Sequence, residues 1–203
     1  MAKKEIYVSV DIEADGPIPG AFSMLNFGAA AFELGNEKPL ATFEVNLSPL
    51  EGASQDPTTM EFWGRNPEAW AYVTKDPIPA SQAIDQFQQW LKSLPGNPVL
   101  VTYPSWDYMW IRWYHVRFLG HTAAQTLGLA ALDVKTLAMA AMKHPTFKNT
   151  SKRTMSKNHP EWFTGHPPHD HTGLSDAIGQ GILFLRIMET LEGGDALPPV
   201  PSP

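Results

Sequence analysis

The chain has 203 residues, of which 43% are hydrophobic, and it contains no cysteine. This length suits a single domain with a full core, and the missing thiols exclude disulfides, thiolate zinc sites and cysteine nucleophiles. The first residues lack the apolar core of a signal peptide, and no apolar run is long enough to cross a membrane. We expect one cytoplasmic, enzyme-sized domain over residues 1–191 and a disordered, proline-rich tail over residues 192–203.

The formal net charge of −6 argues against a protein that binds nucleic acid through its overall charge alone. The charges are unevenly distributed, however. Between Val134 and Pro160 there is no acidic residue, whereas the basic residues of that segment are Lys135, Lys143, Lys148, Lys152, Arg153 and Lys157. This pattern suits a metal-dependent enzyme that acts on a polyanion, and it is also compatible with a solvated basic loop.

An apolar, β-branched run from Ile6 to Ile12 predicts the first strand, which Gly16-Pro17 ends. Asp11 and Glu13 lie two residues apart, so both side chains point to the same face. Neighbouring carboxylates at the end of an apolar strand repel each other unless a proton or a cation compensates, and oxygen ligands suit Mg²⁺ or Mn²⁺. The alternative is an exposed edge strand with a solvated acidic face.

Two more strands are predicted at residues 23–34 and 40–47, with turn residues at 35–39 between them. Short connections between three consecutive strands indicate an antiparallel meander. An aromatic helical piece then runs from Asp56 to Trp70, broken at Asn66-Pro67.

Helices and strands alternate in the rest of the chain. The predicted elements are a helix at 81–94, a buried strand at 99–103, a helix after Asp107, a helix at 130–142, a long loop at 145–168 and a final helix at 174–191. This order predicts an α/β fold with a mixed sheet, an antiparallel meander plus parallel strands, flanked by helices. The first strand should then end beside Tyr103, at the edge of the sheet where ligand sites lie.

Four acidic residues and one histidine stand at these strand ends and helix starts. They are Asp11, Glu13, Asp107, His171 and Asp176. Taken singly, each of the last three is also explained as a helix-starting acid or as an ordinary loop histidine.

The order of these residues resembles that of the DEDDh 3′–5′ exonucleases, which have an RNase H-like fold. The matching stretches are Val10-Asp11-Ile12-Glu13, then Tyr103-Pro-Ser-Trp-Asp107, then His171-Thr-Gly-Leu-Ser-Asp176. The resemblance spans about residues 5 to 190 and looks closest to the RNA-trimming members RNase T, oligoribonuclease and RNase AS.

The resemblance implies that Asp11, Glu13, Asp107 and Asp176 bind two divalent ions, Mg²⁺ or Mn²⁺, and that His171 is the general base. His169 is a rival for that role. The implied substrate is single-stranded nucleic acid, RNA rather than DNA, shortened from its 3′ end with release of nucleoside 5′-monophosphates. The resemblance further implies no membrane association and a homodimer.

The 3′-terminal nucleotide is expected over the turn formed by Ala14, Asp15 and Gly16, where glycine permits close approach of a backbone. Phe22, Met24 and Trp63 are candidates for stacking on its base, and each is equally explained as a core residue. The basic segment would follow the phosphates upstream of the scissile bond.

Three other classes of protein are compatible with parts of this pattern. One is a catalytically silent nucleic-acid or nucleotide-binding module of the same fold. Another is a different metal hydrolase with histidine ligands, for which the candidates are His159, His166, His169 and His171. The third, a purely structural interaction protein, leaves the acidic residues unexplained.

Overall fold

A computed structural model describes residues 4–143, 146–167 and 170–193. Within them, the strands form one sheet in the order β3-β2-β1-β4-β5. Their bounds are β1 Glu5–Ala14, β2 Met24–Glu33, β3 Asn36–Asn46, β4 Asn97–Thr102 and β5 Leu132–Asp133. The first three strands are antiparallel, whereas β4 runs parallel to both β1 and β5. The predicted mixed sheet is confirmed.

The described residues form seven α-helices and three short 3₁₀ helices. The α-helices are α1 Pro57–Arg65, α2 Pro67–Val73, α3 Ala80–Ser93, α4 Trp106–Ala123, α5 Val134–Ala141, α6 Lys152–Asn158 and α7 Gly173–Gly193. The 3₁₀ helices are η1 Ala124–Leu127, η2 Phe147–Thr150 and η3 Pro160–Phe163. In this part of the chain no helix is both long enough and apolar enough to span a membrane.

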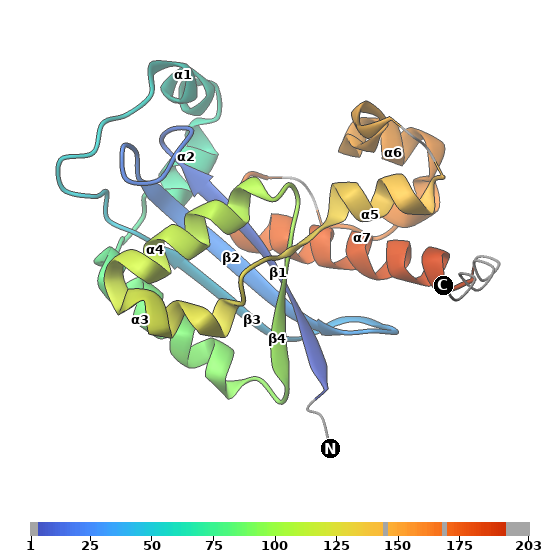
Figure 1. Ribbon diagram of the computed structural model, residues 1–203. Helices are drawn as coiled ribbons and strands as arrows, with labels where there is room; N and C mark the ends of the chain where they lie inside the picture. The colour runs from blue at the N-terminus through green and yellow to red at the C-terminus, as the bar shows by residue number, and fades with distance from the viewer. Residues whose placement is uncertain (1–3, 144–145, 168–169, 194–203) are drawn as a thin grey trace, which may run out of the picture.

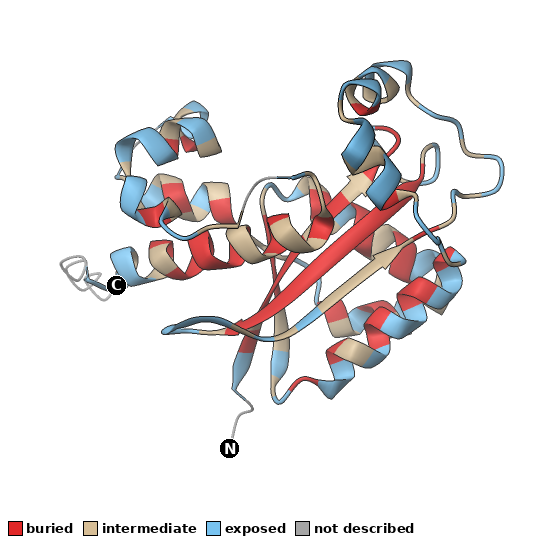
Figure 2. Ribbon diagram, turned by 180° about the vertical axis from the view of Figure 1, so that it is seen from behind, coloured by how far each residue is buried: buried red, intermediate tan, exposed pale blue. Residues whose placement is uncertain are grey.

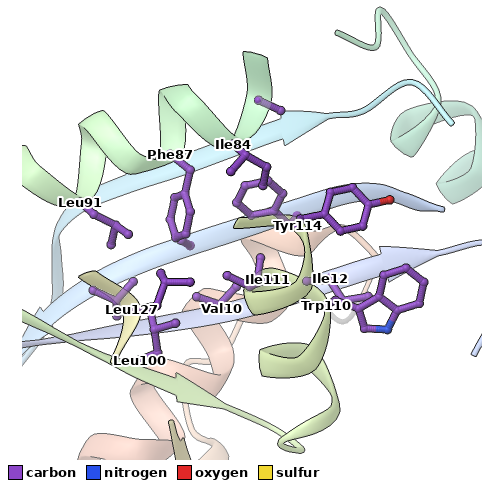
Figure 3. Packing of buried hydrophobic residues seen from close by; sticks show 14 of the residues in the cluster. Val10, Ile12, Ile84, Phe87, Leu91, Leu100, Trp110, Ile111, Tyr114 and Leu127 are labelled. Carbon is purple, nitrogen blue, oxygen red and sulfur yellow. The ribbon is translucent and has the colours of Figure 1, made fainter. Parts of the chain in front are cut away.

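The helices cover the sheet on two faces. On one face, α3 and α4 pack on the central strands through residues such as Val10, Phe87 and Ile111 (Figure 3). On the other face, α7 lies across β1 and β2, and α5 and α6 pack beside it. β1 and β2 are therefore buried along most of their length (Figure 2). Both views place α1–α2 over the end of β1, and α6 apart from them across the molecule (Figures 1 and 2).

Local signals explain where several helices begin. The Asp56 side chain accepts a hydrogen bond from the Thr59 amide at 2.8 Å, and Pro57 follows it, so α1 starts as predicted. The predicted break at Asn66-Pro67 separates α1 from α2. α7 extends to Gly193, so residues 192 and 193 of the expected tail are helical, and residues 194–203 lie outside the described residues.

Two predicted boundaries are wrong. β3 begins at Asn36, directly after a two-residue turn, so Lys38 and Pro39 belong to the strand and not to the turn. Proline is tolerated there because β3 is at the edge of the sheet. The helix expected from residue 130 begins only at Val134, because Asp133 caps it by accepting from the Thr136 amide at 2.8 Å.

The predicted loop at residues 145–168 is also wrong over its described part, which contains η2, α6 and η3. Ser151 starts α6 by accepting a hydrogen bond from the Thr154 amide at 3.2 Å. Met155 and Trp162 are buried in the same apolar cluster as α7, which fixes this segment to the helix. The basic residues of the segment are thus carried by an ordered helical unit.

Close contact between α7 and the sheet depends on glycine. A Cβ atom at Gly28 of β2 would lie 2.1 Å from the Leu174 amide nitrogen, and one at Gly181 would lie 2.1 Å from the Phe32 ring. Only a residue without a side chain lets the first turn of α7 rest on β2 in this way. The position of everything carried by that turn therefore depends on Gly28.

We predict that Gly28→Ala lowers the free energy of unfolding by about 1–3 kcal/mol, because the new methyl group must push backbone apart. The measurement is urea denaturation, with the midpoint shifted and the slope unchanged. Gly64→Ala in α1 is the matched control, since nothing lies within 4 Å of its added Cβ. Equal stability of the two variants would contradict the proposed contact.

Candidate active site

Four carboxylates converge where β1 and β4 end. Asp11 and Glu13 come from β1, Asp107 lies in the first turn of α4 directly after β4, and Asp176 lies in the first turn of α7. Asp107 and Asp176 are almost fully buried, with exposed fractions of 3% and 6%. The fold thus brings the predicted acidic residues to one edge of the sheet.

His171 lies among these carboxylates. Ligand atoms of Glu13, His171 and Asp176 all lie within 4.8 Å of one another, so the three form a group able to hold a metal ion. The His171 backbone has a φ of +58°, an uncommon conformation for a residue with a side chain. Its ring meets the Phe62 ring of α1 edge-on, with centroids 5.0 Å apart.

Burial of so many carboxylates shifts their protonation. The pKa of Glu13 is raised to about 9, chiefly by burial and then by the negative charges of Asp11 and Asp176, against the opposing effect of Lys152. The pKa of Asp107 is also raised well above its usual value, first by burial and then by Asp11 and Glu13. The cluster therefore holds fewer positive charges than its carboxylates need for full ionisation.

The donor set fits a hard divalent cation. All four acidic side chains offer oxygen ligands, and among the described residues the buried Oδ2 atom of Asp107 has no hydrogen-bond partner. An unpartnered buried carboxylate oxygen is costly unless a cation or a proton satisfies it. Oxygen-rich sites of this kind suit Mg²⁺ or Mn²⁺.

Two more residues contact the cluster, namely Lys152, which the sequence singled out only as part of the basic segment, and Gln180, which it did not single out. The Lys152 ammonium of α6 lies 3.6 Å from an oxygen of Asp176, and the Gln180 amide donates a hydrogen bond to Asp11 Oδ1. Gln180 stands four residues after Asp176, on the same face of α7. The sequence shows the spacing between Asp176 and Gln180, but it does not show that Gln180 reaches Asp11 on β1.

The turn after β1 is tightly held. The Trp63 indole donates to the Ala14 carbonyl at 3.0 Å, and the Ser23 amide donates to the buried Asp15 carboxylate at 2.5 Å. A Cβ atom at Gly16 would lie 2.1 Å from the Phe22 ring, so the glycine lets this ring pack against the turn.

Met24 and Trp63, two predicted nucleotide contacts, are buried. Their exposed fractions are 0% and 2%, so neither presents a ring or side-chain face to solvent in this structure. Trp63 instead supports the turn from below through its hydrogen bond to Ala14. Their role in substrate binding remains a prediction.

Among the described residues, neither His159 nor His166 belongs to a group of possible metal ligands. His159 stacks on Trp162 with ring centroids 4.2 Å apart, and His166 packs beside Phe163 at 5.2 Å. Within the described ranges, His171 is the histidine of the acidic group. His169 lies outside the described residues, so the choice between it and His171 rests on the position of His171.

No family model matches the chain. It is 34% identical over 192 residues to a curated protein of Escherichia coli described as "3′-5′ DNA exonuclease Cap18", and the match covers 91% of this chain and 92% of that protein. Among solved structures, the nuclease domain of 3′hExo, "a DEDDh family member, bound to rAMP", has a TM-score of 0.68 at 15% identity, covering 93% of this chain and 92% of that one. S. pombe Pop2p in its "Mg2+ and Mn2+ bound form" has a TM-score of 0.66 at 13% identity, covering 90% and 82%.

The structural likenesses establish the fold, which is that of the RNase H-like exonucleases. The sequence match extends over almost the whole of both chains. The chain belongs to the DEDDh family of 3′–5′ exonucleases.

The raised pKa of Glu13 predicts a pH-dependent stability. Its pKa is about 9 in the folded protein against 4.5 as the reference value, so the folded state holds the proton more tightly. The resulting stabilisation is complete below the unfolded pKa and is lost as the pH rises through the folded pKa. In metal-free protein at about pH 8, Glu13→Gln should therefore raise the free energy of unfolding by about 1–3 kcal/mol.

Thermal unfolding of both proteins between about pH 5 and pH 9 measures this effect. Glu61→Gln, an exposed position on α1, is the control and should follow the wild type. A wild-type stability that does not fall over this range would contradict the assignment.

We predict that removing the hydrogen bond from Gln180 to Asp11 weakens metal binding. Gln180→Met keeps the volume of the side chain but loses the donor to Asp11, and loss of such an orienting contact typically costs 10–100-fold in metal affinity. Calorimetric titration with Mn²⁺ measures it. Gln88→Met removes an equally buried glutamine of α3 that donates to Thr126, and it should leave the affinity unchanged; a similar loss in both variants would show a general effect of core polarity.

Proposed function

We propose that this exonuclease acts on single-stranded DNA, and that it uses two Mg²⁺ or Mn²⁺ ions to release nucleoside 5′-monophosphates from the 3′ end. The observation that carries the proposal is the group of four carboxylates and His171 at the end of β1. Carboxylates gathered in this way repel a negatively charged phosphodiester, so cations must bind between them before the substrate can bind.

The choice of DNA departs from the expectation based on the sequence motifs, which favoured RNA. The motifs alone pointed to the RNA-trimming members, whereas the relative at 34% identity is named a DNA exonuclease and matches along nearly its whole length. A protein distinguishes the two sugars through a contact to the 2′-hydroxyl, and the described residues around the turn identify no such contact. The overall similarity is therefore the stronger guide.

Asp11, Glu13, Asp107 and Asp176 would hold the ions. When bound, such ions activate a water and stabilise charge on the leaving 3′-oxygen. The imidazole of His171, beside Glu13 and Asp176, is placed to accept the proton of the attacking water.

The surrounding residues orient the substrate. The Ala14–Gly16 turn, fixed by Trp63, would support the terminal nucleotide, and Lys152 would offer a positive charge next to the scissile phosphate. The homodimer implied by the family resemblance remains a prediction. A catalytically silent binding module remains the second candidate and requires only the same fold and charges.

The test is degradation of 5′-labelled single-stranded DNA and RNA of matched sequence with Mg²⁺ or Mn²⁺. We expect a ladder that shortens from the 3′ end, faster for DNA, and abolished by a chelator or by Asp11→Asn. His171→Ala should slow cleavage by about 10²–10⁴-fold, the usual contribution of a general base. His121→Ala, an exposed histidine on α4, is the control.

Each outcome has a distinct meaning. Faster degradation of RNA than of DNA would contradict the choice of DNA and support the RNA substrate expected from the motifs. Tight binding of both polymers without any cleavage would support the silent module, and wild-type turnover by His171→Ala would remove the proposed general base.

A further inference from the structure

A pocket lies between α6, η3 and α7, directly beside the acidic cluster. Its volume is about 280 Å³, and Asp176 and Gln180 form part of its wall. The size suits one planar ring system and is too small for a helix or strand of a partner.

The walls of the pocket are largely apolar. Phe163 and Pro167 line one side and Leu183 the other, while Gly179 leaves the face of α7 open. His166 adds a second ring, and burial lowers its pKa to about 4, so the ring is uncharged at neutral pH. Flat apolar and aromatic surfaces are the surfaces on which proteins stack nucleobases.

The pocket has a firm frame. Arg186 of α7 donates to the backbone carbonyls of Glu161 and Thr164 at 3.0 and 2.7 Å, which fastens both ends of η3 to the helix. The same guanidinium pairs with Glu37 of β3. The space between η3 and α7 is therefore a fixed feature of the fold.

Polar groups are present where a nucleotide would need them. Lys152 and Arg153 line the pocket from α6, and a guanidinium is well suited to a phosphate. Within the described chain, His166 Nε2 and Gln180 Oε1 are buried without a hydrogen-bond partner, although both side chains belong to the pocket wall. Both side chains thus have hydrogen-bonding capacity that the described residues leave unused.

The geometry points to this pocket as a binding site for one nucleobase of the substrate, on the 5′ side of the scissile bond. The inference rests on the proposed function and names a position that it leaves open. The terminal nucleotide is assigned to the turn beside α1, and the scissile phosphate to the carboxylates. Because α6 stands across the molecule from α1 (Figures 1 and 2) and its Lys152 reaches Asp176, a strand that continues beyond the carboxylates, away from α1, runs toward this pocket.

Gly179 allows a clean test. A Cβ atom there would lie 3.6 Å from His166 Nδ1 and 3.7 Å from Pro167 Cδ, which are ordinary contact distances. Gly179→Ala therefore narrows the pocket without a clash, and alanine favours the helix. Ser156→Trp obstructs the same pocket from the exposed face of α6.

The experiment measures binding of 5′-fluorescein-labelled single-stranded DNA by anisotropy with Mn²⁺, in a His171→Ala background that slows cleavage. An abasic nucleotide is moved along the strand one position at a time from the 3′ end. We expect one position upstream of the terminal nucleotide at which the missing base weakens binding by about fivefold to a hundredfold, the range for a stacked base. In Gly179→Ala and in Ser156→Trp the intact strand should bind more weakly, and that position should lose its effect.

Gly64→Ala and Ser81→Trp, on α1 and on the exposed face of α3, are the matched controls and should keep the profile of the parent protein. An abasic profile that is the same in the pocket variants and in the parent would overturn the inference while the wild type still shortens DNA. Failure of the wild type to shorten any strand would instead overturn the proposed function, whatever the profile.

Discussion

The structure depends on negative charge held at the end of the central strand of its sheet. β1 is covered on both faces and paired on both edges, so Asp11 and Glu13 lose part of their hydration when the protein folds. Among the described residues, the ammonium of Lys152 and the amide of Gln180 contact carboxylates of this cluster, those of Asp176 and Asp11 respectively. Such a cluster lowers the stability of the folded protein when no metal is bound. Its carboxylates become fully ionised only when cations bind beside them.

The contact between α7 and β2 brings Asp176 to the carboxylates of β1. Gly28 and Gly173 bring the two backbones together, and Asn26 of β2 accepts the Gly173 amide at 2.8 Å. The first turn of α7, which carries Asp176, is consequently fixed on β2 by close backbone packing and by a hydrogen bond to the Asn26 side chain. The basic unit around α6 is anchored to the same helix, so acidic and basic parts of the site share one support.

Much of the fold and of the acidic cluster was predictable because local rules decide it. Alternation in β1 puts Asp11 and Glu13 on one face, and a strand followed by a helix puts Asp107 at the sheet edge. The unpredicted parts depend on tertiary packing. No local sequence signal distinguishes Trp63, which is buried beside the turn, from an exposed residue that stacks on a base. The many prolines and lysines around α6 suggested a loop, and the one local signal for this helix was the N-cap at Ser151.

The site draws on both the first strand and the last helix of the domain. A chain leaving the ribosome presents β1 early, but Asp176 and the contact of α7 with Gly28 become available only after the remaining elements have been made. The nascent protein is thus unable to assemble the acidic cluster before α7 has been synthesised. Any catalysis that depends on this cluster therefore begins only when the whole domain has folded.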